Sequence, residues 1–586
     1  MDSRRLGLTP AEPSGTFHVP HPHPPLPLPF DPVLRRVGAE ATRLGVAAYA
    51  VGGAVRDARL GRDTTDLDIV VVDPAGGARP GVALARAVAA GLGVRAPAVY
   101  EAFGTAAVTV PPDRLDALGV PADALGGAPL VAEFVGARRE SYRADSRKPI
   151  VEDGTLADDL ARRDFTVNAL AADLHPDRFG ETVDLHGGLA DLAARVLRTP
   201  LDPGVTFADD PLRMMRAARF AAQLGFTVAG EAEAAMAAHA ERLDIVSPER
   251  ITDELGKLLA APVPSVGLGL LYRTGLLARV LPEVARLAGV EEVGGRAHKD
   301  NFWHTLEVVD NLAFLQHGVG VGDRVGGFDL WLRWAALLHD VGKAETKRWE
   351  PGTGWTFHGH EDVGPRRIVP EVFRRLRLPL GEPLDFVQTV VRLHHRPAAL
   401  VDADVTDAAV RRLIVDAGDD IDDLMLLVRA DVTSKNARRA RKYLAGYDRV
   451  EARMAEVEAR DGLRNWQPPV SGEDIMAMLG AGEGVAVGML KAWVREAVLD
   501  GDVPNEAGPA RAFVAGKLDE ARRREALFLA VVPALRGADR AAAGPVKDAL
   551  FTHDLPPGHA AALAHVLAVR DAALAARDAE ASPGAS

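Results

Sequence analysis

The chain carries Gly52-Gly53-Ala54-Val55-Arg56-Asp57 and then Asp66-Leu67-Asp68-Ile69-Val70-Val71-Val72, and this stretch decides the fold of its N-terminal part. The apolar run 47–51 before the glycines predicts a short buried strand, and the second segment predicts another. Side chains alternate along a strand, so Asp66 and Asp68 share one face while Leu67 points the other way. Glycines at the end of the first strand let backbone N–H groups approach a phosphate, and Arg56 adds positive charge.

Paired carboxylates next to a phosphate cradle are typical of phosphoryl transfer with Mg²⁺ ions, which activate the attacking oxygen and stabilise the leaving one. Each piece alone is weak, because an isolated Asp-x-Asp is usually a solvated strand end and a Gly-Gly pair is usually a turn. Their order along the chain favours the catalytic interpretation. A third catalytic carboxylate is expected on a second strand, and Glu133 alternates correctly within 131–135. An exposed Glu on an edge strand fits that pattern equally well.

Composition limits the class of protein. The 586 residues suggest about three or four domains, and a hydrophobic fraction of 47% can fill real cores. No run of about 18 apolar residues occurs, so we expect no membrane-spanning helix and no membrane partner. The chain has no cysteine, which excludes disulfides, thiol catalysis and Cys-ligated zinc and fits a cytoplasmic location. The net charge of −13 argues against an overall basic surface but leaves room for a local basic groove that binds nucleic acid.

The pattern of the chain changes along its length. Residues 1–30 are rich in Pro and His and are expected to form a disordered tail. Residues 31–175 mix strands (68–72, 106–110, 130–134) with a helix near 81–92, and from 176 on the pattern is almost entirely helical. Pro211–Leu224 and Pro248–Leu259 are predicted amphipathic helices, and Gly318–Gly327 a glycine-rich loop. The predicted segments are 1–30, 31–175, 176–270, 271–445, 446–515 and 516–586.

Three further segments carry charge that suits a nucleotide. Residues 138–149 are expected to form an Arg- and Lys-rich loop, which either steers polyanions or is simply solvated. Residues 162–169 combine cations, an acid and an amide that suit a ribose hydroxyl and phosphates. Asp210 and Arg213 open a helix and share one face, where an acceptor and a forked donor can pair with a base edge. An N-cap with an ion pair is the structural alternative.

These motifs together resemble those of bacterial tRNA nucleotidyltransferases in the poly(A) polymerase/CCA-adding enzyme family, whose head is related to DNA polymerase β. The resemblance covers about residues 35–515. Its motifs stand in family order: Gly52-Gly53-Ala54-Val55-Arg56-Asp57, Asp66-Leu67-Asp68, Arg162-Arg163-Asp164-Phe165-Thr166-Val167-Asn168-Ala169, Asp209-Asp210-Pro211-Leu212-Arg213-Met214-Met215-Arg216-Ala217-Ala218-Arg219-Phe220 and Ser247-Pro248-Glu249-Arg250-Ile251.

The resemblance implies an α+β fold, with a small mixed-sheet nucleotidyltransferase head at 31–175, a base-reading and RNA-binding neck at 176–270, and an elongated all-α body. It implies addition of C, C and A to the tRNA 3′ end from CTP and ATP, with release of pyrophosphate. Asp66 and Asp68 would carry Mg²⁺. The family usually has Glu where Asp209 stands. The expected nucleotide-binding residues are Gly52, Gly53, Arg56, Arg163, Asp164, Asn168, Asp209, Asp210, Arg213, Arg216 and Arg219.

A second group of ligands lies in the helical region: His304, His339, Asp340, His360, His394 and Asp431. His and Asp suit divalent metals whose identity depends on geometry. The pair His339-Asp340 ends an apolar helical run, where burial without a metal or partner is unfavourable. The set resembles the HD phosphohydrolase superfamily, which implies an HD metal-binding domain at 271–445, with His358 and His395 ranked below the other ligands. Such a site either hydrolyses phosphomonoesters or 2′,3′-cyclic phosphates, or it holds a structural metal.

The C-terminal part adds RNA-binding expectations. Residues 469–476 and 500–505 resemble the tail of HD-bearing CCA enzymes, which implies tRNA binding by 446–515. Lys435, Arg438, Arg439, Arg441 and Lys442 form a basic cluster that suits a phosphate backbone or is an ordinary solvated helix. Residues 516–586 are expected to be added helices with no visible chemistry. The oligomeric state is not indicated.

Two alternatives to CCA addition remain within the family and one outside it. The chain could be a poly(A) polymerase, or an enzyme that adds only CC or only A. An intact segment Arg139–Pro149 favours full CCA addition, because CC-adding relatives lack this flexible loop. The alternative from another class is a metal-dependent phosphohydrolase whose transferase head only binds RNA. The intact Asp66/Asp68 and Asp210/Arg213 pairs argue against it.

Overall fold

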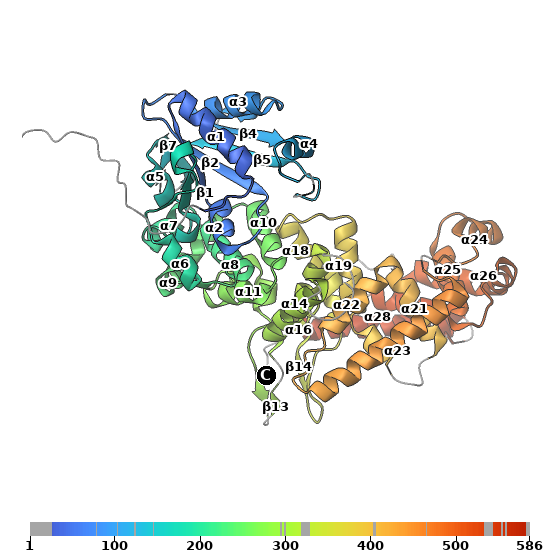
Figure 1. The fold of residues 1–586 in the computed structure, drawn as a ribbon. Helices are drawn as coiled ribbons and strands as arrows, with labels where there is room; N and C mark the ends of the chain where they lie inside the picture. Colours follow the sequence, from blue (N-terminus) through green and yellow to red (C-terminus); the bar gives the residue numbers. More distant parts are fainter. Residues whose placement is uncertain are drawn as a thin grey trace, which may run out of the picture. The chain divides into compact units, whose positions relative to one another are not determined.

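The computed structural model describes residues 26–581, apart from 78, 102–103, 122, 124, 144–145, 294–295, 298–299, 318–328, 402–405, 465, 533–542, 553–554 and 557–558. The side chains of 139–143, 146–151, 293, 296–297, 317, 543, 552, 559 and 576–581 are likewise not described. The chain divides into two compact units (Figure 1): residues up to Gly289 with Val372–Leu378, and Val290–Glu371 with Pro379 onward.

The first unit is built on a seven-stranded mixed sheet with the order β3-β4-β5-β2-β1-β8-β9. Three pairings define its centre: β1 runs antiparallel to both β2 and β8, whereas β2 runs parallel to β5. The predicted strands are therefore confirmed, within a few residues of their expected bounds. The strands are β1 (Ala47–Val51), β2 (Asp66–Val72), β3 (Ala98–Tyr100), β4 (Thr105–Val110), β5 (Leu130–Gly136), β8 (Leu170–Asp173) and β9 (Thr182–Asp184).

Helices α1 (Asp31–Leu44) and α3 (Pro80–Leu92) pack on each other and on the sheet, as Figure 1 shows. Their apolar stripes, which include Val37 and Leu84, are fully buried. Gly81 permits the close approach of α3 to β5, since a Cβ there would lie 2.9 Å from the backbone of Val135. This layer covers one face of the sheet and holds β2 and β5 in place.

The segment expected as a charged loop is instead a β-hairpin of β6 (Arg138–Arg143) and β7 (Ser146–Asp153). Within the described part of the chain its strands pair only with each other, in antiparallel register from Arg138–Asp153 to Arg143–Ser146 with one irregularity. Charge density led to the expectation of a loop. A hairpin hydrogen-bonds its own backbone and tolerates polar side chains when it lies outside the main sheet.

The rest of the first unit is helical, apart from a short parallel pair of β10 (Val196–Leu197) and β11 (Thr227–Val228). Helix α8 lies at its centre, packs on α10 and α11, and buries Met214, Met215 and Ala218. Helix α10 has the predicted bounds, Pro248–Leu259, and begins with Pro at its first position, where a missing N–H does no harm. The helices are α2 (Gly53–Leu60), α4 (Pro112–Ala117), α5 (Leu156–Ala161), α6 (Gly188–Ala194), α7 (Pro203–Asp209), α8 (Leu212–Leu224), α9 (Gly230–Ala238), α10 (Pro248–Leu259), α11 (Pro264–Arg273), α12 (Leu277–Val280) and α13 (Pro282–Ala285).

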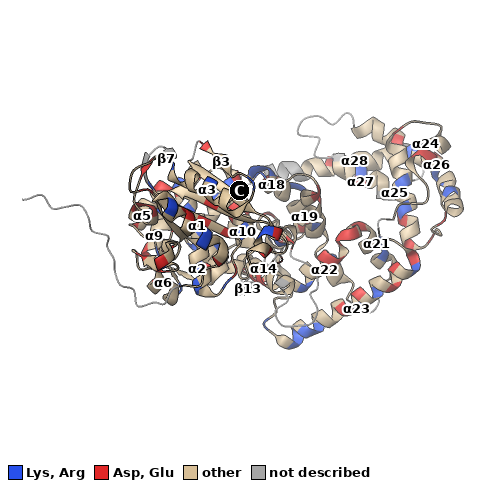
Figure 2. Cartoon of the chain, turned by 45° about the horizontal axis from the view of Figure 1, so that its top comes forward, with Lys and Arg blue, Asp and Glu red and all other residues tan. Residues whose placement is uncertain are grey.

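The second unit is almost entirely helical, with two small antiparallel pairs among its described residues: β12 (Glu292–Val293) with β13 (Arg296–Ala297), and β14 (Arg348–Glu350) with β15 (Gly354–Thr356). Helices α14, α15, α19 and α22 pack against one another, and α23 carries a group of basic side chains at one end (Figure 2). Its helices are α14 (Asn301–His317), α15 (Leu330–Leu338), α16 (Lys343–Thr346), α17 (His360–Val363), α19 (Glu382–Leu393), α20 (Arg396–Ala399), α21 (Asp407–Ala417), α22 (Ile421–Ala430), α23 (Ala437–Asp461), α24 (Gly472–Leu479), α25 (Val485–Asp500), α26 (Ala507–Val531), α27 (Ala543–Thr552) and α28 (His559–Ala581), while α18 (Val369–Arg375) crosses the boundary between the units.

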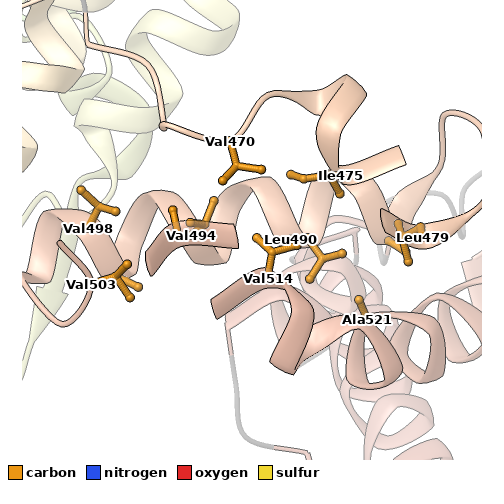
Figure 3. Packing of buried hydrophobic residues seen from close by; sticks show 12 residues of the cluster. Val470, Ile475, Leu479, Leu490, Val494, Val498, Val503, Val514 and Ala521 are labelled. Atoms are coloured by element: carbon orange, nitrogen blue, oxygen red, sulfur yellow. The ribbon is translucent and has the colours of Figure 1, made fainter. Parts of the chain in front are cut away.

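The C-terminal helices share two apolar clusters. In the first, Ile475 of α24, Leu490 of α25 and Val514 of α26 point toward one another (Figure 3). The second joins Met489 and Leu527 to α27 and α28, and Trp493 Nε1 donates to the Phe551 carbonyl at 2.6 Å. The added helices beyond 515 therefore extend the core of α25 and α26.

Two expectations, a disordered N-terminal tail and a glycine-rich loop, concern residues that the structure describes only in part or not at all. Residues 1–25 of the expected tail and Gly318–Gly327 lie outside the described residues. Leu26 and Leu28, within the expected tail, are only 5% exposed, so this part of it packs on the first unit. Among the described helices, none combines the length and apolarity needed to cross a membrane.

Candidate nucleotide and metal sites

Strand β2 presents two carboxylates at its start. Asp66 and Asp68 are exposed on one face while Leu67 and Ile69 are buried, as the period of two requires. Burial together with the neighbouring Asp66 and Asp159 raises the pKa of Asp68, although Arg163 and Arg216 oppose the shift. The raised pKa reflects first the loss of water around the Asp68 carboxylate and then the two neighbouring acids, and a bound cation would stabilise the ionised form.

Gly52 forms the turn between β1 and α2 with φ +70°, a backbone conformation that suits glycine. A Cβ at this position would lie 2.8 Å from Nη1 of Arg163, so glycine also leaves room for that guanidinium. Behind the turn, Arg56 is 8% exposed and donates to Asn168 Oδ1 at 2.7 Å and to Asp57. The turn is thus fixed by a hydrogen bond between residues 112 positions apart.

Asp164 is the buried centre of the polar network. Its carboxylate accepts from Asn168 Nδ2 at 2.9 Å, from the Phe165 N–H at 2.8 Å and from Arg216 Nε at 2.8 Å. Burial alone would raise its pKa, but Arg216 and the hydrogen bond from Asn168 lower the pKa to about 2. Asp164 is therefore ionised and holds Arg216 in place.

Asp210 and Arg213 do not share a helix face, contrary to expectation. The helix α8 begins at Leu212, and Asp210 precedes it in extended conformation, with Oδ1 accepting from the Leu212 N–H at 3.2 Å. Pro211 and the break between α7 and α8 separate the two residues, a turn that the helical spacing did not predict. Arg213 Nη2 donates to the Arg162 carbonyl at 2.7 Å.

All these groups nevertheless meet at one cavity of about 540 Å³. Of the expected residues on this site, Asp209 and Glu133 are not among its lining. Glu133 pairs with Asp68 in the parallel register of β5 and β2, and burial and both aspartates raise its pKa. The expected residues that line the cavity are Gly52, Gly53, Arg56, Asp66, Asp68, Arg163, Asp164, Asn168, Asp210, Arg213, Arg216 and Arg219.

Two important residues were missed at the level of sequence. Asp159, whose side chain is fully buried on α5, accepts from Arg162 Nη2 at 2.5 Å and from Arg163 Nη2 at 3.1 Å. An acid three and four residues before two arginines was the available signal. Arg250 lines the cavity on α10, 3.7 Å from Asp210.

The second unit brings the expected metal ligands together. Asp340 lies at their centre: its carboxylate oxygens are 3.3 Å from His339 Nε2, 3.6 Å from His360 Nε2 and 3.7 Å from His394 Nε2. His304 Nε2 lies 2.9 Å from Asp431 Oδ1 and 3.7 Å from Asp340 Oδ2. Six residues spread over more than a hundred positions thus converge on one point.

Backbone hydrogen bonds orient three of the imidazoles. The Nδ1 atoms of His339, His360 and His394 lie 2.8, 2.8 and 2.6 Å from the carbonyls of residues 336, 357 and 391. A carbonyl only accepts, so each Nδ1 carries the hydrogen and each Nε2 presents a lone pair toward Asp340. This is the arrangement by which proteins hold metal-binding histidines.

The buried atoms at this point suit a bound cation, in addition to Lys343, whose Nζ lies 2.6 Å from Asp340 Oδ2. His339 Nε2, His394 Nε2 and Asp340 Oδ1 are buried and have no hydrogen-bond partner among the described residues, whereas the buried Asp431 Oδ1 contacts His304 Nε2 at 2.9 Å. Burial raises the pKa of Asp340, but His339, His394 and Lys343 hold it well below its usual range. Imidazole nitrogens and carboxylate oxygens aimed at one another fit a divalent transition metal.

His395, which ranked below the others, belongs to the cluster, since its Nε2 lies 3.0 Å from His360 Nε2. Burial and the two neighbouring histidines lower its pKa to about 3, so it is neutral and able to ligate. His358 is exposed and lies outside both candidate ligand groups.

Three family profiles match the chain. They are described as "Poly A polymerase head domain" (residues 48–198), "Probable RNA and SrmB- binding site of polymerase A" (225–287) and "HD domain" (301–433). The first match contains the carboxylate pair and Asp164, and the third contains every residue of the histidine and aspartate cluster. Domains of the first and third kind generally depend on metal ions.

Among known proteins, the chain is 34% identical to an A-adding tRNA nucleotidyltransferase of Deinococcus radiodurans, over 84% of this chain and 96% of the relative. It is 32% identical to a CC-adding tRNA nucleotidyltransferase of Thermus thermophilus, over 80% and 93%. Its fold is similar to that of the Bacillus stearothermophilus CCA-adding enzyme solved in complex with CTP, with a TM-score of 0.54, 24% identity, and coverage of 84% and 99%.

Proposed function

The chain belongs to the poly(A) polymerase and tRNA nucleotidyltransferase family, and from that premise we propose that it adds C, C and A to the 3′ end of tRNA from CTP and ATP. It is a nucleotidyltransferase. One observation carries the proposal: the glycine turn, the Asp66/Asp68 pair and the Asp210/Arg213 pair all line one cavity. We propose the same domain boundaries as the sequence predicts, for the tail, head, neck, HD domain, RNA-binding region and extension. We also propose a cytoplasmic location, because that is where the proposed substrates occur.

Different residues bind different parts of the nucleotide. N–H groups at the Gly52-Gly53 turn, together with Arg163, bind the triphosphate, and Asp164 with Arg216 holds the wall that faces the ribose. Asp210 accepts and Arg213 donates at the base edge, which selects CTP or ATP. Asp66 and Asp68, with Glu133 beside them, would hold Mg²⁺, which stabilises charge on the transferring phosphate when bound. The tRNA 3′-hydroxyl then displaces pyrophosphate from the α-phosphate.

The proposal also specifies which nucleotides the enzyme adds to the tRNA 3′ end. One relative is named A-adding and the other CC-adding, so identity to them does not favour one product. The hairpin β6–β7, at the place of the loop that CC-adding relatives lack, supports full CCA addition. Poly(A) polymerase and partial addition remain the alternatives within the family.

The test is incorporation of labelled CTP and ATP, separately and together, on tRNA transcripts that end before CCA or after CC. Addition of C, C and A followed by a stop is expected. Use of CTP alone would indicate a CC-adding enzyme, and use of ATP only on the CC-ended transcript an A-adding one. Open-ended addition of A would mean a poly(A) polymerase, and no incorporation with either transcript would refute the proposal.

A second activity is favoured by the unpartnered buried atoms of the HD cluster. We propose that His304, His339, Asp340, His360, His394 and Asp431, with His395, hold one or two divalent metal ions and that this site hydrolyses phosphate esters at RNA ends. Hydrolysis of nucleoside 2′,3′-cyclic phosphates with Mg²⁺, Mn²⁺, Co²⁺ or Ni²⁺ should persist in Asp66→Ala and disappear in Asp340→Asn. Metal retained in the wild type without hydrolysis of any phosphate ester would leave a structural metal site.

A further inference from the structure

The HD cluster opens to solvent on one side, where a cavity of about 490 Å³ lies. Side-chain exposure is 28% for Asp431 and 10% for His304, whereas His339, Asp340 and His394 are 1% exposed. Both of the more exposed ligands line the cavity. A ligand therefore reaches the cluster through this cavity, across Asp431 and His304.

The far wall of the cavity is one face of α23. Arg439, Tyr443 and Tyr447 line it and follow one another at intervals of four residues, which places them on the same side of the helix. The Arg439 guanidinium lies 5.7 Å from the centre of the Tyr443 ring, and Nη2 donates to the Tyr443 hydroxyl at 3.4 Å. Tyr447 is buried at the base of this face, 5% exposed. Tyr443 is 38% exposed, so its ring is accessible.

The charge around this wall is positive. Five cations occur between residues 435 and 442, and no acid occurs between Ser434 and Tyr447 in a chain of net charge −13. Figure 2 shows basic residues gathered at one end of α23, where four of the five cations lie in the first two turns and Lys435 just precedes the helix. Thr433 and Ser434 also line the cavity with hydroxyl groups, and Thr433 Oγ1 lies 2.9 Å from His304 Nδ1. Cations, hydroxyls and an accessible aromatic ring together match a ligand that has both a phosphate and a planar base.

We propose that Arg439 and Tyr443 form a nucleoside subsite of the HD centre, in which Tyr443 stacks on the base of a nucleoside phosphate and Arg439 donates to its ribose hydroxyls. This inference rests on the second activity proposed above. It adds a binding site for the nucleoside moiety of the substrate. The subsite makes the HD centre selective for nucleotides and RNA ends over simple phosphate esters. Stacking on a ring is tolerant of base identity, so no strong preference among the four bases is expected.

The experiment measures binding by calorimetry to the full chain loaded with divalent metal. The ligands are cytidine 2′-monophosphate, a short RNA with a 3′-terminal phosphate, and inorganic phosphate. Tyr443→Ala and Arg439→Ala should each weaken binding of the nucleotide about tenfold, within the range for loss of one base stack, and leave inorganic phosphate unchanged. Tyr443→Phe keeps the ring and should retain nearly all of the affinity. Arg449→Ala, an exposed cation farther along α23, is the matched control.

The outcomes separate this inference from the function on which it rests. Tight nucleotide binding that depends on Tyr443, without hydrolysis, would support the subsite and refute the hydrolase. Wild-type affinity in Tyr443→Ala, or equal weakening of nucleotide and inorganic phosphate binding, would overturn the subsite. So would a wild-type protein that binds inorganic phosphate but neither nucleotide ligand. If the RNA binds and the free mononucleotide does not, the occupant is an RNA end.

Discussion

Replacing Asp164 by Asn should destabilise the first unit, because this buried carboxylate is the partner of Arg216. The pKa of Asp164 falls from 3.8 to about 2 on folding. At about 1.4 kcal/mol per pKa unit, the shift corresponds to about 2 kcal/mol of stability at neutral pH. Among the described residues, the ion pair left to Arg216 would be the one with Glu254 at 3.8 Å, and breaking a buried ion pair costs about 3–5 kcal/mol. We expect Asp164→Asn to lower the free energy of unfolding by about 2 to 4 kcal/mol.

The loss should depend on pH in a defined direction. The folded pKa lies below the unfolded value, so the carboxylate stabilises the fold above about pH 4 and ceases to do so as the pH falls through about 2. The difference between wild type and Asp164→Asn should be complete at pH 7 and smaller at pH 3.5. An isosteric Asn keeps the shape of the site, which isolates the charge from packing.

Hydrogen exchange of the α8 amides, followed by mass spectrometry at both pH values, measures opening of the first unit. All seven tryptophans lie in the second unit, so tryptophan fluorescence during urea unfolding should not change. Asp253→Asn is the control, since its ion pair with Lys257 is exposed and worth about 0–1 kcal/mol. A loss below about 1 kcal/mol at pH 7, or a loss that is the same at both pH values, would refute the reasoning.

Three further changes probe other parts of the molecule. Asp66→Ala should reduce incorporation of both CTP and ATP by at least about 10³-fold while tRNA affinity stays within about twofold, because a metal-binding carboxylate acts on the transferring phosphate. Nucleotide incorporation assays measure the first effect and filter binding measures tRNA affinity. Retained incorporation would contradict this role of Asp66. Gly52→Ala should reduce nucleotide affinity, since the residue has φ +70° and a Cβ would displace Arg163; an unchanged KM for CTP would contradict it. Burial and the acids Asp329, Asp420 and Asp422 raise the pKa of Asp423 to about 6. A raised carboxyl pKa stabilises the fold at low pH and loses this effect as the pH rises through about 6, so Asp423→Asn should stabilise the second unit by about 1 kcal/mol at pH 7.5, after allowance for partial exposure, and by nothing near pH 4. Urea unfolding followed by tryptophan fluorescence measures this change, and a destabilised variant at pH 7.5 would contradict it.

Features that depend on a few neighbouring residues could be predicted from the sequence. The shared face of Asp66 and Asp68 follows from the period of two along a strand, and the bounds of α10 follow from Pro248 and an apolar period of 3.6. The hairpin β6–β7 was missed because its charge resembles that of a loop. The break between Asp210 and α8 was missed because a helical spacing says nothing of the turn that precedes the helix.

What the sequence by itself determined is the chemistry: which side chains carry charge, metal ligands and a glycine turn, and in which order. Only the tertiary structure decided which of them meet. Asp68 faces Glu133 through the register of two parallel strands, and Arg56 reaches Asn168 across 112 positions. Asp159 anchors Arg163, and His395 joins the metal cluster while His358 does not. Such contacts join segments far apart in the chain, and they form only when burial of the apolar faces brings those segments together.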